Sequence, residues 1–409
     1  MTTNADASTL AQFQRLIAPI TLDEFFADYW EKKVLYIPRN DPSYYRDILT
    51  FEDVSDYLSR TDLRYPYIRL VQAGQELPLN TYAYDSVFGE NVFQGNLDLD
   101  KLFHLYNNGA TMCMQLQHLA LPKLRSFTNH IERLFEFRTQ STLFLTPPKS
   151  QGFTAHFDSH DFFIFQIHGE KQWLIYDDSV ELPLARNRVL DSEVNVQNPP
   201  SFSPLIRPGD LLYVPRGVFH EALTNNGASL QISLGVFPHL WCDILHKMID
   251  ELSLSHSLLR QSAVTPTISD EAQIEDRFAS IVELLKRFGE PSMVVADLKR
   301  KAASKQSQVC ENRLMDLEAL PDLSLTSELT RRDIQVATRH SEDAVTLFYY
   351  DKEIELPRHV RAEVEFILES HTFCLNDIPS NLDDDGRLSL ARLLIVEGLL
   401  QFSIERSRV

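Results

Sequence analysis

The chain has 409 residues, of which 44% are hydrophobic and 24% charged, so it is long enough for two or three soluble domains. Its 39 basic and 58 acidic residues give a net charge of −19, which argues against a nucleic-acid backbone as the main partner and weakly favours a basic protein. No apolar run approaches the roughly 18 residues of a membrane span, no signal-peptide pattern opens the chain, and the four cysteines are scattered. We therefore expect a cytoplasmic protein that makes no direct contact with a membrane.

The first part of the chain has the texture of a mostly β domain. Residues 1–20 form a polar lead, and from 21 to 240 short apolar strands alternate with Gly and Pro turns. Helical patterns interrupt the strands at 51–60, 99–108 and 122–137. This organisation predicts a strand-rich catalytic domain over residues 21–240.

A helical block follows over residues 241–308. Apolar residues at helical spacing predict helices at 240–259, 271–288 and 294–303. The block contains no cluster of His, Cys and carboxylate residues that would make a site. Its surplus apolar face, around Ile274 to Phe288, predicts a dimerisation module and hence a homodimer.

The last part, residues 309–409, mixes strands and helices. Strand and helix patterns occur at 334–337, 344–350, 360–370 and 388–400, and Asp383 to Gly386 is a capping sequence. This order predicts a winged-helix-like domain. From Leu320 onward there are 17 acidic and 10 basic residues, whereas the recognition helix of a DNA reader is basic. We therefore expect a protein-interaction or structural role without direct nucleic-acid binding.

The motif His156-Phe-Asp158, together with His220, predicts a metal site. Two imidazoles and one carboxylate on one face of a metal are the ligands of non-heme Fe(II) oxygenases. His156 and Asp158 lie two residues apart, so on a strand their side chains would point to the same face. The third ligand, His220, follows a short apolar strand at Leu211–Val214 and the turn Pro215-Arg-Gly217.

His160 is the main competitor as a ligand. His156, Asp158 and His160 alternate, so one strand could present a local zinc or iron site. That reading leaves the His220 motif unexplained, and same-face residues along a strand spread apart by roughly 7 Å. We expect His160 instead to line the substrate pocket or to support the site.

Two stretches of sequence resemble a known family. The stretch Gly209 to His220 reads G-x5-P-x-G-x2-H and resembles the second motif of the cupin superfamily, which folds as a double-sheet jelly roll. The family usually has Asn four residues later, where Thr224 stands here. The stretch His156 to Trp173 resembles JmjC-type cupins of the ribosomal oxygenase group. The residues that carry this second resemblance are His156, Asp158, Asp161, Phe162 to Gln166, Gly169, Lys171 and Trp173.

The resemblance covers residues 15–240 by motif and the rest by layout. It implies an α+β protein with a double-stranded β-helix (cupin) core, a helical dimerisation module and an acidic winged helix. It also implies an Fe(II)-, 2-oxoglutarate- and O2-dependent hydroxylase of a protein side chain, with Arg or His of a basic ribosomal protein as the expected target. The alternatives are a hydroxylase of a peptide or natural product, a metal cupin that needs no 2-oxoglutarate, and a non-catalytic interaction protein.

The far carboxylate of 2-oxoglutarate needs a cation inside the barrel, and Lys171 is the candidate. It shares a predicted strand face with Trp173 and Ile175, where a Lys is unusual unless an anion meets it. Arg207 and Arg216, which flank the His220 motif, are the next candidates.

Polar side chains near the predicted ligands complete the expected pocket. Thr146 and Thr154 could hydrogen-bond the co-substrate. Ser233, on a strand with one polar face, could line the substrate pocket or face solvent.

Overall fold

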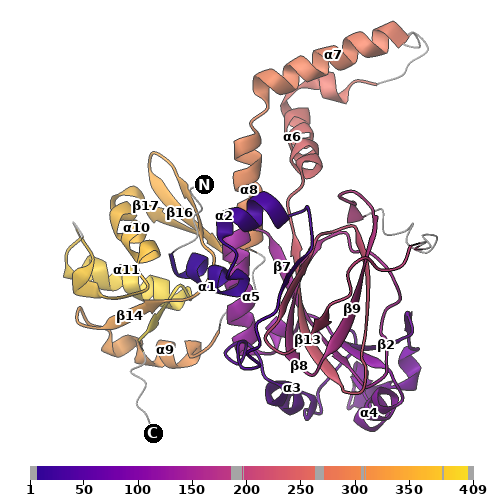
Figure 1. Ribbon diagram of the computed structural model, residues 1–409. Coiled ribbons are helices and arrows are strands. Elements are labelled where there is room, and N and C mark those ends of the chain that lie inside the picture. The colour runs from indigo at the N-terminus through magenta and orange to yellow at the C-terminus, as the bar shows by residue number, and fades with distance from the viewer. Residues whose placement is uncertain are drawn as a thin grey trace. The chain divides into compact units, whose positions relative to one another are not determined.

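The computed structural model describes residues 7–185, 196, 198–262, 271–304, 308, 310–379 and 382–403. The chain divides into two compact units, Met1–Phe237 and Pro238–Val409 (Figure 1). Among the described residues, none of the helices combines the length and apolar character needed to cross a membrane.

Two antiparallel sheets form the core of the first unit. The larger sheet contains, in spatial order, β1 (Leu35–Ile37), β11 (Leu211–Val214), β8 (Asp161–His168), β13 (Ser229–Phe237), β7 (Arg138–Thr146), β6 (Thr111–Met114), β2 (Ile68–Gln72) and β3 (Gln75–Glu76). The smaller sheet contains β10 (Leu205–Ile206), β9 (Lys171–Ser179) and β12 (Val218–Leu223). Side chains from both sheets, such as Phe162 and Leu212 of the larger and Trp173 of the smaller, share one buried cluster. The predicted cupin-type core is therefore confirmed as a two-sheet sandwich.

Helices cover the other face of the larger sheet. Strand β8 is buried on both sides, because Phe162 and Ile164 point between the sheets while Phe163 and Phe165 join a second cluster. That cluster receives side chains from helices α1 (Ala7–Ile17), α3 (Phe51–Leu58), α4 (Leu99–Asn107) and α5 (Pro122–Phe135). The three helices predicted at 51–60, 99–108 and 122–137 are thus confirmed. Shorter elements are α2 (Leu22–Glu24), the π-helical turn η1 (Phe25–Tyr29), η2 (Leu79–Thr81), η3 (Gln117–Leu119) and the hairpin β4 (Ala83–Phe88) with β5 (Asn91–Leu97).

The N-terminal segment differs from the polar lead expected from composition. Helix α1 buries Phe13, Leu16 and Ile17 in the core, where Phe13 contacts the ring of Phe163 edge-on at a centroid distance of 5.8 Å. These apolar residues recur at helical spacing among polar neighbours, so the segment is polar on average although one face of its helix is apolar. The segment is a structural part of the first unit.

The second unit begins with the predicted helices. These are α6 (Trp241–Ser255), η5 (Ser257–Arg260), α7 (Glu271–Phe288) and α8 (Pro291–Ser304). The C-terminal part adds α9 (Arg313–Ala319), η6 (Leu320–Asp322), β14 (Glu328–Arg331), β15 (Ala337–His340), β16 (Ala344–Tyr349), β17 (Lys352–Pro357), η7 (Arg358–Val360), α10 (Arg361–Glu369), β18 (Thr372–Cys374), η8 (Leu375–Asp377), α11 (Asp384–Val396) and β19 (Leu400–Phe402). Its strands make two sheets, in the orders β18-β14-β19 and β15-β16-β17. Asp383 caps α11 as predicted, since its carboxylate accepts a hydrogen bond from Gly386 N at 2.8 Å.

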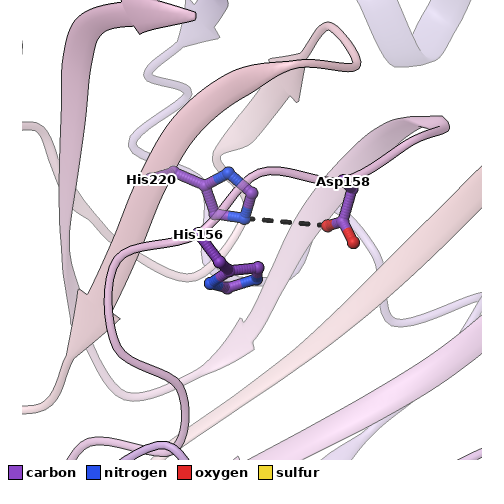
Figure 2. Close-up of side chains that lie close together, drawn as sticks. All are labelled: His156, Asp158 and His220. Carbon is purple, nitrogen blue, oxygen red and sulfur yellow. Dashed lines mark ion pairs between the residues drawn. The ribbon is translucent and has the colours of Figure 1, made fainter. Parts of the chain in front are cut away.

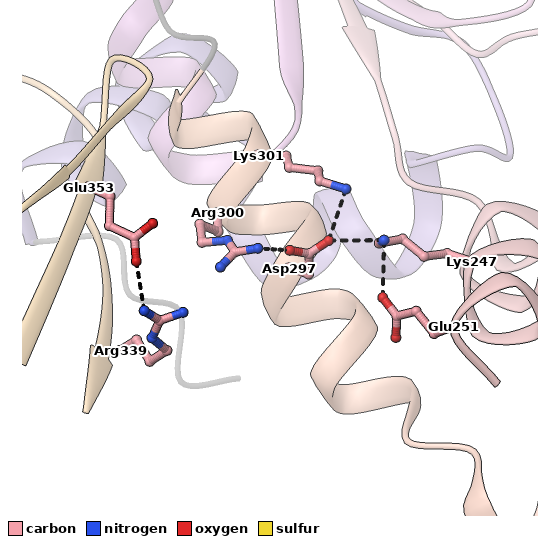
Figure 3. Close-up of polar contacts among 7 residues, drawn as sticks. All are labelled: Lys247, Glu251, Asp297, Arg300, Lys301, Arg339 and Glu353. Carbon is pink, nitrogen blue, oxygen red and sulfur yellow. Dashed lines mark hydrogen bonds and ion pairs between the residues drawn. The ribbon is translucent and has the colours of Figure 1, made fainter. Parts of the chain in front are cut away.

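Helix α8 joins the two predicted parts of this unit, 241–308 and 309–409. On one side Asp297 pairs with Lys247 of α6 at 3.3 Å, within a cluster that also includes Lys301 (Figure 3). On the other side Arg300 lies 5.0 Å from the centroid of the Phe348 ring of β16. Because α8 packs on both neighbours, the structure groups residues 238–409 as one compact unit.

Candidate metal centre

The structure brings His156, Asp158 and His220 together (Figure 2). Each offers one ligand atom, and these atoms all lie within 4.8 Å of one another. His220 Nε2 is 3.7 Å from Asp158 Oδ2, and the two imidazole centroids are 4.5 Å apart. One carboxylate oxygen and two imidazole nitrogens converging in this way can bind a divalent transition metal.

Backbone hydrogen bonds place the ligands on neighbouring segments. His156 N donates to His220 O at 3.1 Å, and His220 N donates to His156 O at 2.8 Å. Gly217 N donates to Asp158 O at 2.8 Å, which ties the turn before β12 to the segment that carries Asp158. The strand expected through His156 and Asp158 is reduced to a single bridge pair, because this segment leaves the sheet until β8 begins at Asp161.

Gly217 is required by this close approach. Its φ is +86°, and an added Cβ would lie 1.9 Å from the carbonyl oxygen of Val180. Only a residue without a side chain allows the turn to pass this carbonyl and to reach Asp158 O.

Both histidines have their ring orientation fixed by the backbone. His156 Nδ1 lies 2.7 Å from Thr154 O, and His220 Nδ1 lies 3.0 Å from Val218 O. Because a carbonyl oxygen only accepts hydrogen bonds, each Nδ1 carries the proton and each Nε2 keeps its lone pair. This is the arrangement in which a histidine binds metal through Nε2.

Burial keeps His220 neutral. Its ring lies 4.9 Å from Phe162 and 5.7 Å from Trp173, measured between centroids. Desolvation, followed by the neighbouring His156, lowers the pKa of His220 to about 4. At neutral pH this imidazole therefore needs no deprotonation before it binds a cation.

His160 stands apart from the three ligands. Its ring stacks on Phe237 at a centroid distance of 4.5 Å and occupies the space beside Gly235, where a Cβ would lie 2.8 Å from the ring. The structure thus groups His220, and not His160, with His156 and Asp158.

Lys171 is buried between the sheets, with 5% of its surface exposed. Its Nζ donates to Thr146 Oγ1 at 3.0 Å and lies 6.0 Å from the Phe144 ring centroid. Among the described residues, no carboxylate lies within ion-pair distance of this ammonium group, and burial lowers its pKa to about 8. The alternative cations are engaged elsewhere, since Arg207 pairs with Glu170 at 3.0 Å and Arg216 with Glu31 at 2.5 Å.

The other predicted pocket residues, Thr146, Thr154 and Ser233, lie in different surroundings. Thr146 is buried and contacts Lys171. Thr154 is exposed, its side chain lies against Gly74, and its carbonyl oxygen orients His156. Ser233 is half-buried and pairs with Thr142 and Ile164 on the neighbouring strands.

Two polar atoms near this space lack partners in the described part of the chain. Trp173 Nε1 and Gln231 Oε1 are buried without a hydrogen bond. Leaving such groups unpaired is costly, so their presence indicates that a polar ligand or water meets them.

A buried ionic cluster that no local sequence pattern indicates supports the ligand segments. Tyr213 OH donates to Asp161 Oδ1 at 2.7 Å, and Arg216 Nε lies 4.0 Å from Asp161 Oδ2. Glu31 joins through Arg216 and through its own N–H, which donates to Tyr213 OH at 2.8 Å. Burial raises the pKa of Asp161 to about 6. The cluster fixes β8, the turn before β12 and the N-terminal segment together.

Comparison with known proteins agrees with this geometry. A family model described as a JmjC domain matches residues 117–244. Curated relatives include the bifunctional lysine-specific demethylase and histidyl-hydroxylase NO66 of Culex quinquefasciatus, 31% identical over 254 residues, covering 60% of this chain and 37% of the relative. The protein of the same name in Drosophila melanogaster is 27% identical over 229 residues, covering 55% and 33%. The match thus spans about a third of the length of these relatives.

Among solved structures, the chain is similar in fold to YcfD of Escherichia coli. The X-ray structure of that protein aligns with a TM-score of 0.57 at 16% identity, covering 94% of this chain and 98% of the other. A structure described as the ribosomal oxygenase YcfD with cobalt and 2-oxoglutarate aligns with a TM-score of 0.56 at 14% identity, covering 94% and 99%. This likeness and the two-sheet core show a cupin-type fold, within which residues 117–244 match the JmjC domain model.

Proposed function

We propose that this chain is an Fe(II)- and 2-oxoglutarate-dependent oxygenase that hydroxylates a protein side chain. The main support for the proposal is that two features occur together in the two-sheet sandwich of the first unit. These are the cluster of His156, Asp158 and His220, and the buried ammonium of Lys171, which lacks a carboxylate partner among the described residues.

The donor set fits Fe(II). The imidazoles of His156 and His220 and the carboxylate of Asp158 would hold the metal and leave positions open for co-substrate and O2. When bound, the iron would supply the oxygen-activating chemistry. The protein's own contribution is to hold both Nε2 lone pairs toward the site, through the carbonyl groups of Thr154 and Val218, and to keep His220 in a dry environment.

Lys171 fits the far carboxylate of 2-oxoglutarate. An ion pair inside the sandwich would offset the cost of burying the ammonium, and the Thr146 hydroxyl, which accepts from Lys171 Nζ, would donate a further hydrogen bond to the carboxylate. This feature favours the 2-oxoglutarate-dependent reading over a metal cupin that uses no 2-oxoglutarate. Cobalt and 2-oxoglutarate bound to YcfD support the same assignment by likeness of fold.

The reaction can be tested directly. Purified protein loaded with Fe(II) should release succinate from 2-oxoglutarate when a substrate protein is added, and chelation should stop the release. If succinate never exceeds the level in an Asp158→Ala control with any ribosomal protein, the assignment is wrong.

The finer proposal concerns the substrate. We infer a basic ribosomal protein carrying the hydroxylated Arg or His, a reading supported by the net charge of −19 and by the descriptions of the relatives as a histidyl-hydroxylase and a ribosomal oxygenase. Mass spectrometry of ribosomal proteins from cells with and without the gene should show the addition of one oxygen atom. No such difference at any Arg or His would refute the inference.

We also propose roles for the second unit. The exposed apolar residues Ile274, Phe278 and Phe288 on α7 would form a homodimer interface, and residues 309–409 would act as a winged-helix-like protein-interaction domain without nucleic-acid binding. A cytoplasmic location follows from the ribosomal substrate. Light scattering, a nucleic-acid binding assay and cell fractionation would test these three roles.

A further inference from the structure

The β4–β5 hairpin is an exposed apolar element in the first unit. Its two strands form a sheet of their own, and most of their residues are exposed on both faces. At its tip, Phe88 is 80% exposed and Val87 71%, and Val87 is paired across the strands with exposed Val92. A two-stranded hairpin is marginally stable by itself, and apolar side chains at its tip add no stability in water.

The base of the hairpin is firmly held. Tyr65 N donates to Gly95 O at 3.0 Å, Leu97 N donates to Leu63 O at 3.0 Å, and Asp85 Oδ1 accepts from Gly95 N at 2.9 Å. The hairpin is therefore presented in one conformation at its root, while the tip projects its apolar side chains. A preformed strand of this kind needs little ordering when it binds a partner.

The hairpin also lacks the features that usually prevent strand addition. Exposed edge strands normally carry Lys or Pro, but residues 83–97 contain no Lys, Arg or Pro. Within the described structure, no further strand pairs with the outer edge of β4. An extended peptide could add to such an edge through backbone hydrogen bonds, with alternate side chains on the apolar surface.

The charged residues on and around the hairpin indicate which kind of partner it would bind. Between Leu70 and Asp100 the chain has no Lys or Arg. Glu76 and Asp98 of this stretch are paired with Arg69 and Lys101, and the guanidinium of Arg64 lies 5.3 Å from the centroid of the Phe93 ring. Asp85 and Glu90 are the acidic residues of the hairpin itself. The tip of the hairpin carries Glu90 beside Val87 and Phe88 and has no basic residue of its own, so it is complementary to a basic, partly apolar polypeptide and would repel anionic lipid or nucleic acid.

The β2–β3 turn, which precedes the hairpin in sequence, is hydrogen-bonded to the segment that leads to the metal centre. In the β2–β3 turn, Ala73 N donates to Gln151 O at 3.0 Å and Gly74 N to Gly152 O at 2.7 Å. These carbonyl groups belong to the segment that leads to His156.

We propose that the β4–β5 hairpin is a docking strand for a basic, extended segment of the polypeptide substrate. The proposal rests on the proposed function for the identity of the polypeptide as a substrate. Val87 and Val92, which are paired across the strands and therefore share one face, would contact the apolar side chains on that face of the added segment, and Glu90 would attract the basic ones.

A binding assay tests the proposal without turnover. The probe is a labelled peptide of about ten residues that alternates Lys and Val, and the readout is fluorescence polarisation with the full chain. The Val87→Ser/Val92→Ser double variant should bind it about tenfold or more weakly, because it removes the apolar pair that the valines of the peptide would contact. The control Leu314→Ser removes an apolar side chain that is 74% exposed on α9 and should leave the affinity within about twofold.

Two further arms examine charge and strand addition. Glu90→Lys keeps the apolar tip, and it should weaken the Lys–Val peptide and strengthen a Glu–Val peptide. A Lys–Val peptide with Pro at its centre should bind poorly, because Pro cannot donate a strand hydrogen bond. Circular dichroism verifies that each variant is folded.

Several results would overturn the proposal. Equal binding of the Lys–Val peptide to wild type and the double variant would place the contact elsewhere. Loss of self-association in the double variant, without peptide binding by wild type, would make the hairpin an interface between copies of this chain. Partition into phosphatidylcholine vesicles without peptide binding would make it a lipid contact. Because no arm measures succinate, failure of the oxygenase assignment would be seen separately.

Discussion

Replacing Lys171 by Met should have opposite effects on the free protein and on co-substrate binding. The ammonium is buried between the sheets, and its pKa falls from the ordinary value of 10.5 to about 8 because burial disfavours the charged form. Met keeps most of the side-chain volume and removes the charge. We therefore expect the ligand-free variant to unfold at a higher temperature than wild type, while its affinity for 2-oxoglutarate falls.

The magnitudes follow from the burial and the missing partner. Lowering the pKa from 10.5 to about 8 costs the folded state roughly 3 kcal/mol, at about 1.4 kcal/mol per tenfold change in the proton equilibrium. This cost is fully present below pH 8, where Lys171 is charged in both states, and it disappears as the pH rises toward 10.5. Loss of a buried charge partner typically weakens binding by about 2–5 kcal/mol, or roughly 30- to several-thousand-fold in affinity.

Calorimetric titration with 2-oxoglutarate and thermal unfolding between pH 7 and about pH 11 would measure both effects. The stability difference between Lys171→Met and wild type should shrink across that range, and Lys171→Arg should bind 2-oxoglutarate better than Lys171→Met. The control Lys123→Met, at an exposed residue paired with Asp53, should change stability by less than about 1 kcal/mol. An affinity for 2-oxoglutarate within about threefold of wild type in Lys171→Met would refute the reasoning.

Further predictions concern the metal centre and the helical block. Asp158→Ala should abolish succinate release and retain the fold. His160→Ala should keep its iron. If His160→Ala instead loses iron, the alternative metal site formed by His156, Asp158 and His160 would be the correct one. Gly217→Ala should lower the free energy of unfolding by roughly 1–3 kcal/mol and weaken metal binding, because its Cβ would meet Val180 O. The control Gly227→Ala, whose Cβ would have nothing within 4 Å, should do neither. Equal free energies of unfolding for the two variants would contradict this prediction. Phe278→Glu, at a residue 66% exposed on α7, should give a monomer by light scattering if wild type is a dimer, and a wild-type monomer at micromolar concentration would end the dimer proposal.

The regular spacing of apolar residues along the sequence predicts the strands and helices well. The alternation of Lys171, Trp173 and Ile175 correctly places all three side chains on one buried strand face, because a strand repeats every two residues. The helix expected at 271–288 has those bounds in the structure, since a long amphipathic repeat is a strong signal.

Features that depend on contacts between distant residues could not be read in the same way. His156 was expected on a strand, yet it forms one bridge pair with His220, and nothing in its local sequence reveals that partner. Arg216 contacts Glu31, 185 residues away, and the two share no sequence pattern. The strand expected at 334–337 begins only at Ala337, because buried Ile334 joins the core without pairing in a sheet.

The cluster of Glu31, Arg216 and Asp161 has a consequence for any attempt to isolate the JmjC domain. The matched residues, 117–244, exclude Glu31 and also β1 and β6, which pair with β11 and β7. A fragment cut at those limits would have two unpaired sheet edges and a buried arginine without its main acidic partner. The match to the JmjC domain model thus begins in the middle of a sheet, and a fragment that keeps this core intact would also need helix α1, whose Phe13, Leu16 and Ile17 are buried in it.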